Sequence, residues 1–202
     1  ESTGRFVLDN KGPVVIVTGF FIVGAQASET DGPPGAVALG NVLSSLGCGV
    51  RYVTDSCSFD IVNGLSDKQH EVIEFPILSD IESEKLPFED NSIEACFSHM
   101  LYCMALSTQE LEYLNREIHR ILKPKGINVY TARHTGDGDY MNGIHIGEDL
   151  YENDGFIVHF FSEKKIRSLS KGFNILNIEK FEEGSFPRKL FKVTLEKNSL
   201  AG

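Results

Sequence analysis

The chain alternates between short β-branched runs and longer stretches in which apolar residues recur at helical spacing. Val14–Val17 is apolar at every position. Such a run predicts a central strand of a parallel sheet, because both of its faces would be buried. Apolar side chains then recur at intervals of three and four residues over Pro34–Leu46, which predicts a helix ended by Gly47. A second strand is predicted over Val50–Thr54.

The same alternation continues through the middle of the chain. The predicted elements are a short helix beginning at Phe59 and strands over His70–Leu78, Ile93–Phe97 and Ile127–Thr131. The strongest helix signal lies before the last of these strands. Ser107 and Glu110 have the spacing of a capping box, and an apolar stripe follows them. Pro124 and Gly126 are predicted to end this helix.

The C-terminal part begins with a polar segment, Arg133–Gly155, which is rich in glycine, aspartate and asparagine. We interpret it as a long loop or lid, since long loops inside a domain are usually functional. Ser162 is predicted to cap another helix. Phe173–Phe181 and Leu190–Leu195 have the pattern of a β-hairpin.

This order of elements predicts an α/β fold. Strands that alternate with helices indicate a doubly wound, Rossmann-like parallel sheet in a three-layer α-β-α arrangement. The closing hairpin would add antiparallel strands at one edge. Since one sheet would run through the whole chain, residues 1–202 are expected to form a single domain.

Composition narrows the function classes. The formal net charge of −10 argues against a nucleic-acid partner. No apolar run approaches the roughly 20 residues of a membrane helix, and no basic segment precedes a signal-like core, so a cytoplasmic protein is expected. A small-molecule ligand is compatible with this composition, and the oligomeric state is not indicated. The four cysteines form no Cys-x-x-Cys pair, which favours small buried side chains over disulfides or a metal site. They are Cys48, Cys57, Cys96 and Cys103.

Two motifs in the later part of the chain carry a family resemblance. They are Leu86-Pro87-Phe88-Glu89-Asp90-Asn91-Ser92-Ile93 and Glu117-Ile118-His119-Arg120-Ile121-Leu122-Lys123-Pro124-Lys125-Gly126. On these motifs, residues from about 70 to 197 resemble the class I S-adenosylmethionine-dependent methyltransferases. Lys125 departs from the family's usual pair of glycines. The terminal hairpin agrees with the resemblance.

The resemblance implies a set of cofactor-binding residues. Asp80 would reach the adenine amino group and Ile81 would pack on the ring, while Ser98 and His99 would face cofactor or substrate. The carboxyl ends of strands are also where open α/β sheets bind ligands. Two alternatives stay open: Asp80 as a solvated carboxylate or helix cap, and His99 as a packed histidine rather than a catalytic base.

The glycine-rich turn of the methyltransferase family is missing. Gly19 follows the first strand, but Phe20 and Phe21 come next and the helix begins about a dozen residues later. Glycine is needed at such a turn because a Cβ would block close approach of the backbone to the ligand. Asp55, after the second strand, could take ribose hydroxyls. S-adenosylmethionine is therefore a candidate cofactor, although the glycine-rich turn that usually binds it is missing.

The N-terminal part resembles a different family. Residues 12–65, and above all Glu29-Thr30-Asp31-Gly32-Pro33-Pro34-Gly35-Ala36, are similar to the D-glutamate cyclase family. The resemblance implies that Glu29 and Asp31 shuttle protons beside a helix N-terminus. The alternative is that these residues only cap and complement that helix.

The two resemblances together predict a hybrid with a cyclase-like segment 1–65 and a methyltransferase-like segment 66–202. Because neither site is complete, we favour a recombined or designed Rossmann-like scaffold without an established activity. One alternative is a methyltransferase acting on a small molecule, and the other is a D-glutamate cyclase-like lyase.

Overall fold

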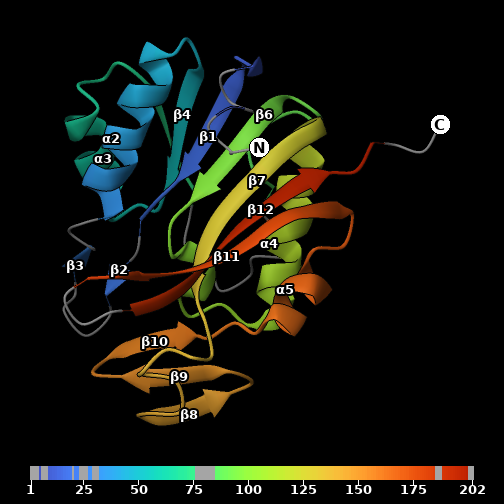
Figure 1. The fold of residues 1–202 in the computed structure, drawn as a ribbon. Helices are drawn as coiled ribbons and strands as arrows, with labels where there is room; N and C mark the ends of the chain where they lie inside the picture. The colour runs from blue at the N-terminus through green and yellow to red at the C-terminus, as the bar shows by residue number, and fades with distance from the viewer. Residues whose placement is uncertain are drawn as a thin grey trace.

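The computed structural model describes residues 5, 9–19, 21–22, 27–28, 32–75, 85–184 and 188–199. They build a seven-stranded sheet with the order β11-β12-β7-β6-β1-β4-β5 (Figure 1). Its strands are β1 (Pro13–Val17), β4 (Gly49–Thr54), β5 (Glu71–Glu74), β6 (Ile93–Ser98), β7 (Leu122–Arg133), β11 (Phe173–Glu183) and β12 (Arg188–Lys197). The first five are parallel, and β12 is antiparallel to both β7 and β11. The predicted fold class is confirmed.

Helices cover both faces of this sheet, as Figure 1 shows. One face carries α2 (Gly32–Ser45) and α3 (Phe59–Leu65). The other carries α4 (Thr108–Ile121) and α5 (Glu163–Leu169), and a short 3-10 helix, η2 (Leu101–Cys103), follows β6.

The uniformly apolar β1 follows from this layering. Val14 and Ile16 pack into the core beneath α2 and α3, whereas Val15 belongs to the larger core beneath α4 and α5. Successive side chains of a strand point to opposite faces, so a strand covered on both sides needs apolar residues throughout.

The predicted loop Arg133–Gly155 is largely wrong. It contains two strands of a separate antiparallel sheet with the order β10-β9-β8. The strands are β8 (Ile144–Gly147), β9 (Leu150–Asn153) and β10 (Phe156–His159). Asp154 and Gly155, both at positive φ, form the turn between β9 and β10. An Asp-Gly pair is a strong hairpin signal, and here the polar composition of the segment concealed it.

Several boundaries also differ from the prediction. The strand β7 begins directly after α4, at Leu122 rather than Ile127, and β5 is shorter than expected within the described residues. A small antiparallel pair, β2 (Phe21–Ile22) and β3 (Ala27–Ser28), lies between β1 and α2. The capping box is confirmed, since the Ser107 side chain accepts from the Glu110 amide and Glu110 accepts from the Ser107 amide. Ser162 likewise caps α5.

The four cysteines are free thiols. Cys48, Cys96 and Cys103 are buried, as expected, but Cys57 is exposed. Burial raises the pKa of the Cys96 thiol to about 12, which keeps it protonated and inert. In the part of the chain that the structure describes, no helix is long and apolar enough to cross a membrane.

The two sequence motifs of the later part lie together at the amino end of β6. The Arg120 guanidinium donates to the backbone oxygens of Leu86 (2.9 Å) and Phe88 (2.7 Å). It also donates to the Glu117 carboxylate, which in turn accepts from the Leu86 amide. This cluster holds residues 86–90 against α4 and explains why the motifs occur as a pair.

A second cluster closes the same end of the sheet. The Lys197 ammonium donates to the Asn91 side chain (2.8 Å) and to the backbone oxygens of His119 (2.6 Å) and Leu122 (2.7 Å). These carbonyls belong to the C-terminus of α4, where helices leave acceptors unpaired and favour a cation.

Candidate functional site

A cleft of about 760 Å³ opens at the carboxyl ends of β1 and β6. The N-terminal part of α2, the residues that follow β6, and the tip of the β11–β12 hairpin form its walls. The crossover through α2 leads from β1 to β4, while the crossover through α4 leads from β6 to β7 on the other side. The cleft therefore lies at the topological switch point, where open α/β sheets bind ligands.

The floor of the cleft requires a glycine after β1. Gly19 has φ +112°, and a Cβ there would lie 2.4 Å from Asp55 Oδ2 and 2.5 Å from Thr54 Oγ1. Asp55 is buried behind Gly19 and accepts from Ser58, at 2.8 Å from its amide and 3.3 Å from its hydroxyl. The predicted residues Gly19 and Asp55 thus lie next to each other. The described hydrogen bonds of the Asp55 carboxylate, however, stabilise the turn that follows β4 rather than reach into the cleft.

Two buried hydroxyl groups flank the end of β1. Ser98 Oγ on β6 and Thr54 Oγ1 on β4 have no hydrogen-bond partner among the described residues. Ser98 lines the cleft and is 8% exposed. An unpaired buried hydroxyl costs about 1–3 kcal/mol, so such a group at a cleft is typical of a site that a ligand completes.

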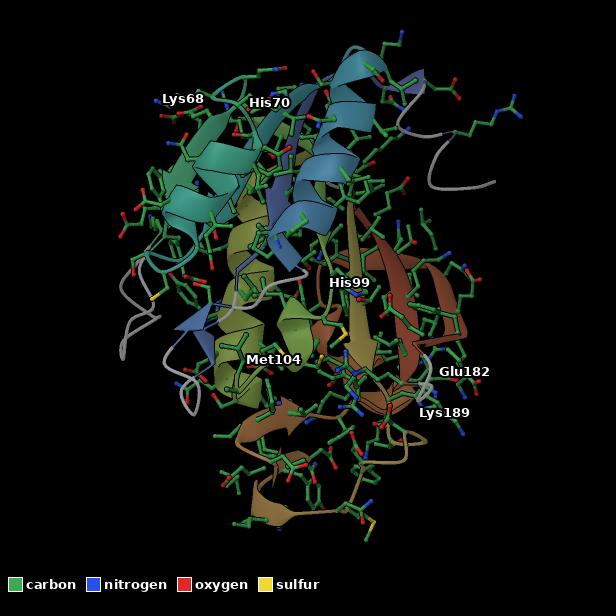
Figure 2. All side chains as sticks on the ribbon, turned by 90° about the vertical axis from the view of Figure 1, so that its left-hand side faces the viewer. Lys68, His70, His99, Met104, Glu182 and Lys189 are labelled. Carbon is green, nitrogen blue, oxygen red and sulfur yellow. The ribbon has the colours of Figure 1, made fainter. Side chains whose placement is uncertain are left out.

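His99 is the most accessible imidazole of the cleft. Its Nδ1 lies 2.9 Å from Thr131 Oγ1 on β7, and its Nε2 lies 3.3 Å from Glu183 Oε2 at the end of β11. Figure 2 shows His99 between the lower end of α2 and the three-stranded sheet. Of the two alternatives for His99, its exposure does not favour a packed strand-end histidine, because half of its side chain (53%) is accessible.

Two further residues of the cleft were not predicted. Arg188, the first residue of β12, is exposed and forms no ion pair with another described residue. Arg188 is the cross-strand partner of Glu183 in the β11–β12 hairpin, so a positive and a negative side chain occupy neighbouring positions near its tip. Met100 has φ +55°, which is uncommon for a residue other than glycine and typically marks a functional or constrained position.

The predicted site residues divide into three groups. Gly19, Ser98 and His99 line the cleft, and Asp55 lies directly behind it. The other four predicted residues are outside the described residues: Glu29, Asp31, Asp80 and Ile81. Thr131, Glu183 and Arg188 were missed, because no local pattern marks them and only the insertion of β12 beside β7 brings the hairpin to the cleft.

The described residues fit S-adenosylmethionine poorly. A short glycine turn from β1 into the first crossover helix would be needed, whereas here β2 and β3 occupy that connection. The close approach of Thr54 and Asp55 to Gly19 also fills the side of the turn away from the cleft.

Comparisons with known proteins agree with both resemblances. A family model described as D-glutamate cyclase-like, C-terminal, matches residues 3–142. The match continues across residues 65–70, so the cyclase-like segment is longer than the predicted 12–65, and no comparison indicates a recombined or designed origin. No curated protein matches the sequence significantly.

Solved structures similar to this chain include several S-adenosylmethionine-dependent methyltransferases. One from Methanosarcina mazei is 16% identical, with 96% of each chain covered and a TM-score of 0.67. A second, 1,6-didemethyltoxoflavin-N1-methyltransferase from Burkholderia thailandensis, has bound S-adenosylhomocysteine; it is 13% identical, with 94% of this chain and 72% of that chain covered and a TM-score of 0.62. A third, an N-methyltransferase from Bradyrhizobium japonicum with S-adenosylhomocysteine, is 9% identical, with 96% and 83% covered and a TM-score of 0.61. At these identities the likeness shows a shared fold.

Proposed function

Since the chain belongs to the D-glutamate cyclase-like C-terminal family, we propose that its cleft binds D-glutamate and closes it to the five-membered lactam with loss of water. The observation that carries this proposal is the contact between His99 and Glu183 at the mouth of the cleft, 3.3 Å between Nε2 and Oε2. An imidazole and a carboxylate in contact form a pair that can move protons during acyl chemistry.

The reaction balances without an oxidant, a reductant or a second substrate. The amine nitrogen forms a bond to the side-chain carboxyl carbon, and one carbon–oxygen bond of that carboxyl group breaks. The nitrogen gives up two of its three ammonium protons, and the departing oxygen takes up two protons and leaves as water. The His99–Glu183 pair would carry these protons across the short distance between nitrogen and oxygen.

Substrate recognition would use the positive features of the cleft. The chain as a whole is acidic, with a formal net charge of −10, so a dicarboxylate needs local attraction. Arg188 supplies a guanidinium suited to a carboxylate. The N-terminus of the fourteen-residue α2 adds its dipole and the backbone N–H groups of Gly32 and Gly35, since Pro33 and Pro34 have none. Glu29 and Asp31 directly precede α2 in the sequence and stay candidates for proton transfer.

The test is turnover of D-glutamate, with the lactam measured by chromatography and mass spectrometry and L-glutamate run in parallel. His99→Ala should lower kcat by about 100-fold or more, the usual contribution of a proton-transfer group. Arg188→Met should mainly raise KM. His145→Gln is the matched control, because His145 is an exposed histidine on β8 outside the cleft. Equal turnover by the wild type and His99→Ala would contradict the proposal.

The strand order favours a second candidate, binding of S-adenosylmethionine. The overall fold is shared with methyltransferases, with a TM-score of 0.67 for the one from Methanosarcina mazei. The connection from β1 to α2 argues against this ligand. Calorimetric titration with S-adenosylmethionine separates the candidates: micromolar affinity without lactam formation would favour the methyltransferase. If the protein neither binds S-adenosylmethionine nor forms the lactam, the remaining interpretation is a scaffold without activity.

A further inference from the structure

Thr131 on β7 connects two groups at the edge of the cleft. Its hydroxyl oxygen lies 2.8 Å from the Met100 amide nitrogen and 2.9 Å from His99 Nδ1. A backbone N–H can only donate, so Thr131 Oγ1 accepts from Met100. Its single hydroxyl proton therefore stays available for a different acceptor.

The opposite side of the His99 ring decides where that proton goes. Glu183 Oε2 lies 3.3 Å from Nε2, and an ionised carboxylate has only acceptors. Nε2 must carry a proton for this contact to be attractive. In a neutral imidazole Nδ1 is then unprotonated and accepts from the Thr131 hydroxyl. Both sides of the ring thus agree on one tautomer.

The backbone beside His99 supports this arrangement. Met100 has φ +55°, a conformation that costs on the order of 1 kcal/mol for a residue with a side chain. Strained residues persist where neighbouring contacts fix them. The hydrogen bond from the Met100 amide to Thr131 is such a contact, and it orients the hydroxyl toward the ring.

We propose that Thr131 is a positioning residue that holds His99 with its proton on Nε2, and that Glu183 is the proton acceptor of the cleft. The sequence alone left His99 open as a catalytic base or a packed histidine. In the tautomer that Thr131 selects, the ring nitrogen facing the cleft has no free lone pair, so it donates to Glu183 and fixes the carboxylate at the mouth. Glu183 then takes the ammonium protons of the substrate in turn and returns them to the departing oxygen. This catalytic part rests on the proposed function; the tautomer does not.

Nitrogen NMR of isotopically labelled protein tests the tautomer without any turnover. Above the titration range of the ring, the wild type and Thr131→Ser should show a protonated Nε2 and an unprotonated Nδ1 for His99. Thr131→Val keeps the shape but removes the hydroxyl, and should shift His99 toward a mixture of tautomers. A protonated Nδ1 in the wild type, or an unchanged spectrum in Thr131→Val, would overturn the assignment.

Kinetics with D-glutamate test the catalytic part. Glu183→Gln should lower kcat by about 100-fold or more. Glu182→Gln should change it less than twofold, because successive side chains of β11 point to opposite faces of the sheet. Loss of an orienting partner typically costs 10-fold or more, so we expect about a 10-fold lower kcat with little change in KM for Thr131→Val, and recovery in Thr131→Ser. Full activity of Glu183→Gln would refute Glu183 as the acceptor. Absence of turnover in every form, with the expected spectra, would refute the proposed function and leave the tautomer standing.

Discussion

The two ends of strand β6 follow opposite rules. At the amino end, the Arg120 and Lys197 side chains donate to backbone oxygens at the end of α4 and in residues 86–88. They also donate to the side chains of Glu117 and Asn91. At the carboxyl end, a buried Ser98 hydroxyl has no partner within the described residues. Met100 has a left-handed backbone conformation there, and the His99 imidazole between Ser98 and Met100 is half exposed.

This difference separates stability from binding along one strand. Hydrogen bonds and ion pairs close the amino end. The unpaired buried hydroxyl and the half-exposed imidazole lie at the carboxyl end, where the topology opens a cleft. Groups prepared for a ligand typically reduce the stability of the free protein. Removing a side-chain hydrogen-bonding group should therefore destabilise the protein at the amino end but not at Ser98.

The largest effect is expected at Arg120. Arg120→Met would leave the buried Glu117 carboxylate without its cation and would remove the guanidinium donor from the backbone oxygens of Leu86 and Phe88. Removing one partner of a buried ion pair costs about 3–5 kcal/mol, so urea denaturation should show a loss of that size. Arg116→Met, an exposed arginine on the same helix, is the control and should cost less than about 1 kcal/mol. Equal losses of unfolding free energy for Arg120→Met and Arg116→Met would contradict a stabilising role of the Arg120 cluster.

Lys197 should give the next largest effect. Lys197→Met removes three hydrogen bonds from a side chain that is almost fully buried in the sheet. A loss of about 2 kcal/mol in the free energy of unfolding is expected, because bonds from a charged donor are among the stronger ones. Lys192→Met breaks only an exposed ion pair with Glu179 and should cost less than about 1 kcal/mol.

The opposite sign is expected at the carboxyl end. Ser98→Ala removes a hydroxyl that has no described partner and should leave the free energy of unfolding unchanged or raise it by up to about 1 kcal/mol. Ser170→Ala is the matched control, because the equally buried Ser170 hydroxyl donates to the Ile166 oxygen at 2.7 Å. Its loss should cost about 1 kcal/mol. Thermal and urea denaturation measure both, and a costly Ser98→Ala would contradict the contrast.

A substitution at Lys125, near the amino end of β6, should increase the stability of the protein. Its φ is +67°, which explains why the methyltransferase pattern has glycine there. Lys125→Gly should raise the free energy of unfolding by about 0.5–1 kcal/mol, since the exposed side chain contributes little and the strain is relieved. Lys171→Gly, an exposed lysine without positive φ, should instead lower it by a similar amount.

The pH dependence should be the smallest effect. Partial burial and the nearby Lys197 charge lower the pKa of His119 below its ordinary value of 6.5. The unfolded chain then binds the proton first as the pH falls, so the contribution of His119 is present above 6.5 and is lost below it. Denaturation curves at several pH values should show a shallower decline for His119→Gln than for the wild type.

Much of the fold could be predicted from local patterns. The all-apolar β1 indicated a sheet covered on both faces, and the pair Ser107 and Glu110 located the start of α4. The site could be predicted only where it follows a strand directly, as at Gly19, Ser98 and His99. Thr131 reaches His99 because β7 pairs with β6, whereas Glu183 reaches it because β12 pairs with β7 and carries β11 with it; no short segment encodes either long-range contact. The β8–β10 sheet was missed because its strands are only four residues long.

The position of β12 between β7 and β11 has a consequence for synthesis on the ribosome. The strand β11 can join the sheet only through β12, which is made after it. A nascent chain that has emerged as far as Glu183 therefore has all of the central parallel strands but cannot yet place that carboxylate beside His99. The contact between His99 and Glu183 can therefore form only after β12 has been made and the hairpin has docked beside β7.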